Sequence, residues 1–98
     1  MSSFFDLTAS EQPVLVDFFA EWCGPCKTMT PILKEVKKTM GDKIKILKID
    51  VDKNQRLATA LNVQGVPTLM LYKKSKLLWR QSGVIPINDI VLKINECF

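Results

Sequence analysis

Two cysteines separated by two residues carry the clearest chemical signal in the chain. They form the motif Cys23-Gly24-Pro25-Cys26, which follows an apolar run and opens a stretch of helical periodicity, so both thiols lie at a strand-to-helix turn. The N-terminus of a helix presents unpaired amide groups and a partial positive charge, which favour the thiolate of Cys23. This arrangement predicts thiol–disulfide exchange: Cys23 attacks a substrate disulfide, and Cys26, inside the helix and less accessible, resolves the mixed disulfide.

Three other interpretations of this cysteine pair are weaker but stay open. A purely structural disulfide would close a loop of only four residues, which removes little entropy from the unfolded chain. Half of a structural zinc site would need further ligands, and the chain holds three cysteines and no histidine. The third interpretation is that both cysteines lie in a core by coincidence. We therefore expect a redox-active pair and no metal.

The rest of the sequence predicts one α/β domain, residues 1–98, that positions this turn. The chain has 98 residues, 47% of them hydrophobic, which suits a single core. Because the first two strands are joined through a helix they should be parallel, and a short turn makes the last pair antiparallel. This predicts a central mixed sheet of about four strands flanked by helices. The periodicity places strands at 14–19, 44–51, 68–72 and 76–82, and helices at 25–40, 54–61 and, with Pro86 as its first residue, 86–98.

Charge and hydropathy exclude other classes of protein. Fourteen lysines and arginines against ten acidic residues give a net charge of +4, but the lysines are scattered and few aromatic residues accompany them, so we expect no nucleic-acid binding. No apolar run approaches the roughly 18 residues of a membrane span, so no membrane partner is expected. The first residues lack the pattern of a secretory signal, which predicts a cytoplasmic protein.

A longer set of motifs resembles the thioredoxin family in order along the chain, from about Val14 to the C-terminus. The resemblance implies the thioredoxin fold, a redox-active disulfide between Cys23 and Cys26, and the activity of a general protein-disulfide reductant, an enzyme of electron transport and cell redox homeostasis. The motifs are Asp17-Phe18-Phe19-Ala20-Glu21-Trp22-Cys23-Gly24-Pro25-Cys26-Lys27, Pro31 within the helix, Lys48-Ile49-Asp50-Val51-Asp52, Gly65-Val66-Pro67-Thr68 and Gly83.

The resemblance also gives roles to a buried acid and a neighbouring lysine. Asp17 is implied to accept and return the proton of Cys26, through water, and its place in an apolar run independently predicts a raised pKa. The alternative is an acid that faces solvent on a half-exposed strand. Lys48 is implied to lie beside Asp17 and to oppose the rise of its pKa; the alternative is a lysine that extends to the surface.

A docking surface for substrate is implied opposite the disulfide. Pro67 corresponds to the family's cis-proline, and the backbone of Val66 would pair with an extended substrate segment. The residues implied to form the active-site motif and this surface are Trp22, Gly24, Pro25, Val66, Pro67, Gly83 and Val84.

The implied partners follow from the dithiol being the redox centre itself. No bound cofactor is expected, and a thioredoxin reductase that draws on NADPH or ferredoxin would return electrons taken by diverse disulfide-containing client proteins. One alternative is a disulfide oxidase or isomerase of the same fold, against which Gly24-Pro25 argues. The other is a binding module that uses the docking surface without turnover.

The sequence departs from the family pattern in four places. Only 22 residues precede Cys23, too few for a full first strand and first helix, so the strand at 44–51 should be a sheet edge and a mostly monomeric protein should dimerise weakly there. Phe19 replaces a common tryptophan and the turn at 73–75 lacks glycine; neither is expected to touch the thiols. Cys97 is expected as a small hydrophobe at the core edge, or else as a site of glutathionylation or intermolecular disulfide formation.

Overall fold

The computed structural model describes residues 2–98, which form helices and strands around one sheet. No helix in this range combines the length and apolar character needed to span a membrane. The elements, in chain order, are α1 (Ser2–Thr8), β1 (Val14–Phe19), α2 (Gly24–Met40), a short 3-10 helix (Gly41–Lys43), β2 (Lys45–Asp50), α3 (Gln55–Ala60), β3 (Thr68–Lys73), β4 (Lys76–Ser82) and α4 (Ile87–Asn95).

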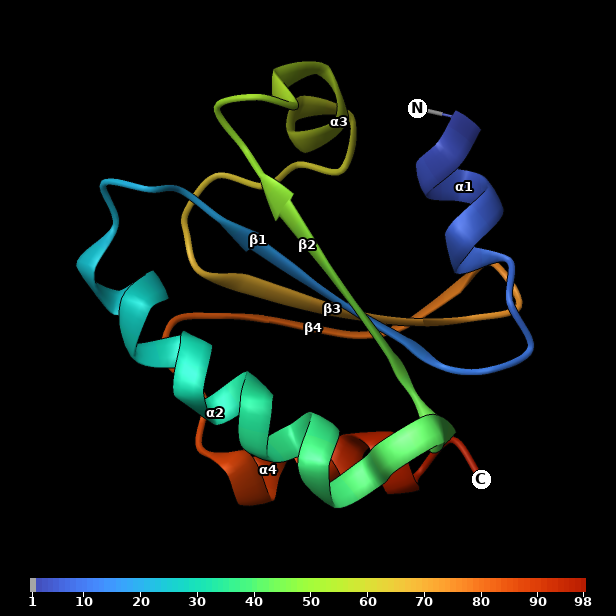
Figure 1. The fold of residues 1–98 in the computed structure, drawn as a ribbon. Helices are drawn as coiled ribbons and strands as arrows, with labels where there is room; N and C mark the ends of the chain where they lie inside the picture. Colours follow the sequence, from blue (N-terminus) through green and yellow to red (C-terminus); the bar gives the residue numbers. More distant parts are fainter. Residues whose placement is uncertain (1) are drawn as a thin grey trace.

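The four strands form one mixed sheet in the order β2-β1-β3-β4. β1 pairs with β2 in parallel, whereas β1 with β3 and β3 with β4 are antiparallel. Helices α2 and α4 cover one face of the sheet and α1 and α3 lie over the other (Figure 1). The predicted mixed sheet of about four strands is confirmed, and so is the parallel crossover through α2.

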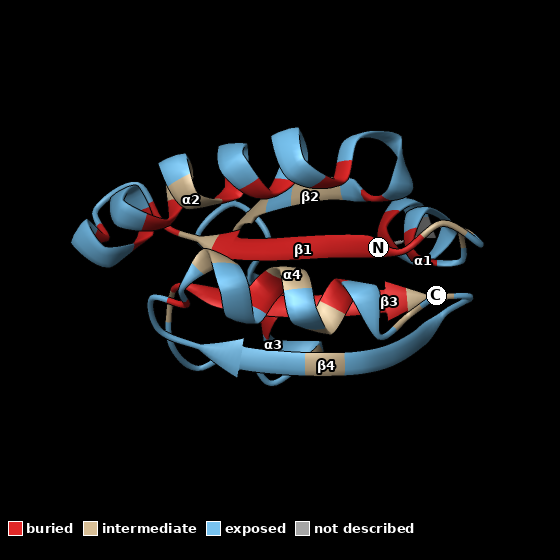
Figure 2. Cartoon of the chain, turned by 90° about the horizontal axis from the view of Figure 1, so that it is seen from below, coloured by how far each residue is buried: buried red, intermediate tan, exposed pale blue. Residues whose placement is uncertain are grey.

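β1 lies at the centre of the molecule and is buried along almost its whole length, as the red ribbon in Figure 2 shows. Its odd-numbered residues face α2 and α4, and its even-numbered residues face α1 and α3. On the first face, the helical periodicity of α2 and α4 supplies the apolar side chains that cover Leu15; on the second, Phe4 of α1 packs edge-on against Tyr72, with ring centroids 5.6 Å apart. Two layers of core therefore hold β1 in place.

Local backbone geometry explains where two helices begin and end. Gly41 ends α2 with a φ of 57°, and its amide donates to the Lys37 carbonyl, as expected for a C-terminal cap. The expectation that Pro86 is the first residue of the last helix is wrong: its ψ of 147° is extended, so it precedes the helix as its N-cap. Its carbonyl still accepts from the amides of Asp89 and Ile90, which is how the first turn of α4 closes.

The segment after α1 compensates for the absence of glycine in the β3–β4 turn. Lys74 and Ser75 both adopt positive φ, 53° and 68°, a conformation that side chains disfavour. The Lys74 amide donates to the Ser10 carbonyl at 2.9 Å and the Ser75 amide to the Thr8 carbonyl at 3.0 Å. These bonds stabilise the turn without glycine. At the other edge of the sheet, β2 pairs with β1 and with no further strand in the described part of the chain, so the predicted free edge is confirmed there.

Candidate active site

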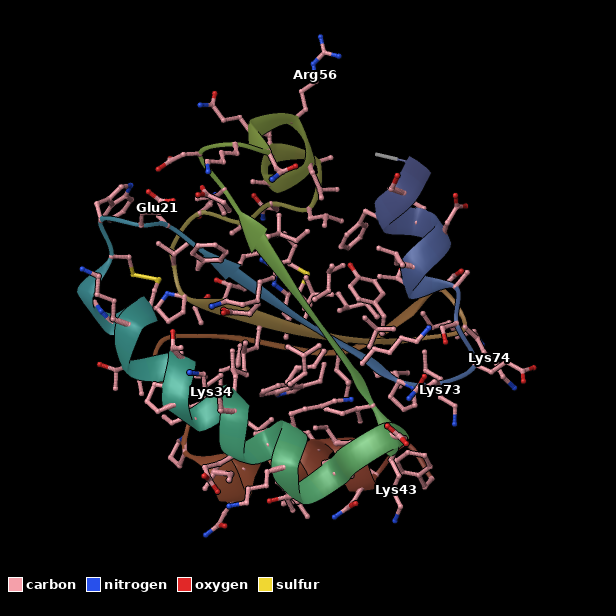
Figure 3. The ribbon with its side chains drawn as sticks, viewed as in Figure 1. Glu21, Lys34, Lys43, Arg56, Lys73 and Lys74 are labelled. Atoms are coloured by element: carbon pink, nitrogen blue, oxygen red, sulfur yellow. A yellow bond between two sulfur atoms is a disulfide. The ribbon has the colours of Figure 1, made fainter. Side chains whose placement is uncertain are left out.

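Cys23 and Cys26 form a disulfide at the start of α2, seen as the yellow bond in Figure 3. Their Cα atoms are 5.3 Å apart, within the usual range for a disulfide. Cys23 is the N-cap of α2, and its Sγ accepts a hydrogen bond from the Cys26 amide at 3.1 Å. The same amide would stabilise negative charge on Cys23 after reduction, so the structure supports this sulfur as the thiolate.

The two sulfurs do not differ in exposure as the sequence analysis expects. Cys23 is 3% exposed and Cys26 is 5% exposed, so in the disulfide form neither residue is the more accessible one. The reason is that Val66, from the loop before β3, covers Cys23: its carbonyl oxygen lies 3.6 Å from Cys23 Sγ. Position in the helix, not exposure, distinguishes the two cysteines.

The loop before β3 brings the implied docking residues together beside the disulfide. The Val66-Pro67 peptide bond is cis, as the resemblance implies, and the Gly83 amide donates to the Pro67 carbonyl at 2.8 Å. Gly83 has a φ of 95°, which favours glycine there, and Val84 next to it is exposed. Gly24 and Pro25 are exposed in the first turn of α2. Val66 thus packs against the cysteine cluster, and the Pro67 carbonyl holds Gly83 next to the same loop.

Trp22 borders a shallow groove next to this loop, and its orientation depends on a residue to which the sequence analysis gave no role. Its ring is 72% exposed, and Nε1 donates to Asp52 Oδ2 at 2.8 Å. The only signal for Asp52 was its place just after β2 in a motif shared with the family. The groove has a volume of about 110 Å³ and is lined by Trp22, Val51, Val63, Gln64, Gly65 and Val66.

Asp17 is buried on the face of β1 that α2 covers. It is 1% exposed, and its Oδ1 has no hydrogen-bond partner among residues 2–98. Burial raises the pKa of Asp17 to about 6, and the positive charge of Lys48 opposes that rise. The predicted burial and pKa direction are confirmed, and the alternative of a solvent-facing acid is wrong.

Lys48 is the register partner of Asp17 on the parallel strand β2, but its side chain is exposed. Its Nζ lies over the ring of Phe19, 4.9 Å from the ring centroid. The part of the chain that the structure describes contains no ion pair between Lys48 and Asp17. Both sequence interpretations therefore hold in part: Lys48 acts on Asp17 through its charge while its ammonium stays at the surface.

Phe19, which is expected not to touch the thiols, borders the cluster that contains both cysteines. Its side chain packs against the small apolar cluster formed by Ala20, Cys23 and Cys26. The sequence could have indicated this position of Phe19. Side chains alternate between the two faces of a strand, and Phe19 lies two residues after Asp17, so both share one face. A cavity of about 220 Å³ opens beside it and gives solvent a route to Cys26; it is lined by Phe19, Ala20, Glu21, Cys26, Lys27, Thr30 and Lys48.

Cys97 is the free cysteine, and it is not part of the site. The C-terminus that follows it lies at the opposite end of α2 from the disulfide (Figure 1). Its side chain is half-buried against the core under α4, and burial raises the pKa of this thiol. Its packing agrees with the expectation of a small hydrophobe at the core edge.

The sheet order, the disulfide that caps α2 and the cis-proline beside it place the chain in the class of proteins with the thioredoxin fold. The chain belongs to the thioredoxin family, since the family model described as Thioredoxin matches residues 2–96. The resemblance stated from the sequence is therefore confirmed for both family and fold.

Individual relatives agree with this assignment. A thioredoxin from Bacillus subtilis (strain 168) is 46% identical over 92 residues, which cover 94% of this chain and 88% of the relative. Thioredoxin Y, chloroplastic, from Oryza sativa subsp. japonica is 45% identical over 97% of this chain, but the chain spans only 57% of that relative's length. A solved mutant thioredoxin from Halobacterium salinarum NRC-1 has a TM-score of 0.88 at 33% identity, covering 98% of this chain and 83% of the other.

The raised pKa of Asp17 predicts that this residue destabilises the folded chain at neutral pH. In the unfolded chain the carboxyl loses its proton near pH 3.8, whereas in the folded chain it does so near pH 6. Between these values unfolding releases a proton, so stability falls as pH rises and stays lower above pH 6. Asp17→Asn should therefore raise the free energy of unfolding at pH 8 by about 3 kcal/mol and leave it nearly unchanged below the unfolded pKa.

Urea unfolding of the oxidised protein at several pH values measures this effect. Asp6→Asn, at an exposed position in α1, is the matched control and should show no such pH-dependent gain. An equal stabilisation by Asp17→Asn below pH 3.5 and at pH 8 would contradict the assignment of the cost to burial of the charge.

Proposed function

We propose that this protein is a general protein-disulfide reductant that acts by dithiol–disulfide exchange through Cys23 and Cys26. The observation that carries the proposal is the disulfide at the N-cap of α2, with the Cys26 amide 3.1 Å from Cys23 Sγ and the Val66 carbonyl on its other side. Membership of the thioredoxin family supports the same activity.

The proposed reaction has two exchange steps. The Cys23 thiolate attacks one sulfur of a client disulfide; that bond breaks, the second client sulfur leaves as a thiolate and takes up a proton, and a mixed disulfide forms. Cys26 then loses its proton and attacks Cys23 Sγ, which releases the first client sulfur. The product is the Cys23–Cys26 disulfide that the structure contains, and the client has gained two electrons and two protons.

Asp17 is the proposed proton acceptor for the second step. Its burial and its pKa of about 6 suit a base that works near neutral pH, and the cavity beside Cys26 would admit the water that relays the proton. Lys48 is proposed to moderate the basicity of Asp17 through its charge. An extended client segment would lie in the groove beside Trp22 and pair with the backbone of Val66.

The proposed partners are diverse disulfide-containing proteins and a thioredoxin reductase that uses NADPH or ferredoxin. The shallow, apolar groove supports broad recognition, since it offers no deep pocket for one small substrate. No bound cofactor is proposed, because the dithiol itself carries the electrons. The proposed location is the cytoplasm, a reducing compartment in which the free Cys97 thiol would persist.

The reduction potential of the cysteine pair distinguishes the reductant from an oxidase of the same fold. We expect about −270 mV, the value typical of thioredoxins, when the protein is equilibrated with a dithiothreitol redox buffer and its thiols are alkylated. A potential above about −200 mV would assign the protein to the oxidases or isomerases. The absence of a reversible two-electron transition would leave a binding module as the remaining function.

The order of attack predicts a trapped intermediate. Cys26→Ser removes the resolving thiol, so a client disulfide should form a stable mixed disulfide with Cys23 that mass spectrometry detects and dithiothreitol releases. Cys97→Ser is the matched control and should turn over like the unaltered protein, because Cys97 lies away from the site. Continued turnover by Cys26→Ser, or a mixed disulfide on Cys97, would contradict the assigned roles.

We further propose that the protein is mainly monomeric and pairs weakly with a second copy along the free edge of β2. Lys45 and Val51 direct their amides toward β1, so the backbone groups of the intervening even-numbered residues point away from the sheet. Sedimentation velocity under reducing conditions, with Cys97→Ser to exclude a disulfide dimer, should show reversible association at high concentration. A single monomeric species up to millimolar concentration would contradict this proposal.

A further inference from the structure

Three side chains under the start of α2 form an arrangement that the cysteine chemistry alone does not require. Asp17 and Phe19 lie two residues apart on β1 and share one face of the sheet, and Lys48 is the register partner of Asp17 on β2. Two groups near the Lys48 ammonium can attract it: the carboxylate of Asp17 and the ring of Phe19. The ammonium lies over the ring, 4.9 Å from its centroid, within the range of a cation–π contact.

Because the Lys48 ammonium contacts the ring of Phe19, the carboxylate of Asp17 has no direct partner in the described part of the chain. Asp17 Oδ1 is buried and makes no hydrogen bond, and Lys48 Nζ forms no ion pair with it in the described part of the chain. The ammonium instead borders the cavity that reaches Cys26, with Phe19 on the same wall. Lys48 is thus held close enough to act on Asp17 through its field but outside the contact that would neutralise it.

We propose that Phe19 is a positioning residue: its ring holds the Lys48 ammonium at the mouth of the cavity and so prevents a direct ion pair between Lys48 and Asp17. This rests on the proposed function, in which Asp17 accepts the proton of Cys26. An acid in direct contact with an ammonium holds its negative charge too readily to be an effective base. The ring therefore preserves the basicity that the second exchange step needs.

Other charged groups around the acid do not replace Lys48 in this role. Lys27 of α2 and Glu21 of the preceding turn also line the cavity, as does Cys26, but Lys48 is the group whose positive charge opposes the rise in the pKa of Asp17. The contact with Phe19 also spares the ammonium the loss of water that full burial beside Asp17 would require. Glu21 already pairs with Lys53, so removal of the ring should leave the Asp17 carboxylate as an attractive partner for Lys48.

The test is a titration of the Asp17 carboxyl carbon by NMR, in the oxidised protein. Phe19→Leu should lower the pKa of Asp17 by about one unit or more, as expected when a lysine comes into contact with an acid. Phe19→Tyr keeps a ring in place and should restore the value of the unaltered protein. In a Lys48→Met background the pKa of Asp17 should rise, and Phe19→Leu should then have no further effect.

The double variant separates positioning from simple repacking. If Phe19→Leu leaves the Asp17 titration unchanged or raises its pKa, or if it lowers the pKa equally when Lys48 is Met, the proposal is overturned. The titration needs no turnover, so its result is independent of the proposed function. The rate of release of the mixed disulfide tests that function separately: an Asp17→Asn variant with an unchanged rate near neutral pH would remove Asp17 from the reaction while the contact between Phe19 and Lys48 would stand.

Discussion

Burial of β1 on both faces is the constraint on which the rest of the molecule depends. Its side chains alternate between two apolar layers, one under α2 and α4 and one under α1 and α3. The end of a strand held this firmly directs the chain into α2 at a defined point, so that Cys23 becomes the N-cap and its sulfur meets the amide of Cys26. The redox pair is therefore positioned by the core, although both cysteines lie at its margin.

The same burial has two effects on Asp17: its charge lowers the stability of the folded chain, and its raised pKa suits it to proton exchange. An acid on the inward face of a central strand loses its water, and this raises its pKa toward the pH at which proton exchange is effective. At neutral pH the charged form of Asp17 makes the folded chain less stable, because its buried Oδ1 has no hydrogen-bond partner among residues 2–98. A hydrogen bond or ion pair that satisfied Asp17 would stabilise the fold and remove the property that the proposed mechanism uses.

Interactions at the periphery adapt the short N-terminal segment to this core. α1 covers the second face through Phe4, and the residues after it accept hydrogen bonds from the β3–β4 turn, which allows Lys74 and Ser75 to take positive φ. No strand precedes β1 within residues 2–98, so β2 stays unpaired on its outer side. The short segment before β1 thus supplies apolar packing against the sheet, but it supplies no strand that would pair with the outer edge of β2.

The sequence by itself determined the order of the four strands and of α2, α3 and α4, the mixed sheet and the cysteine pair, because these depend on local periodicity and on a motif of fixed spacing; it did not predict α1. It also predicted that Asp17 is buried, since its strand carries apolar side chains on both faces. Only the tertiary structure decided the equal burial of the two cysteines, through the cover that Val66 gives to Cys23, and the position of Lys48 over the ring of Phe19. Each of these depends on segments far apart in the chain, and no local pattern encodes which of several neighbours a side chain will contact.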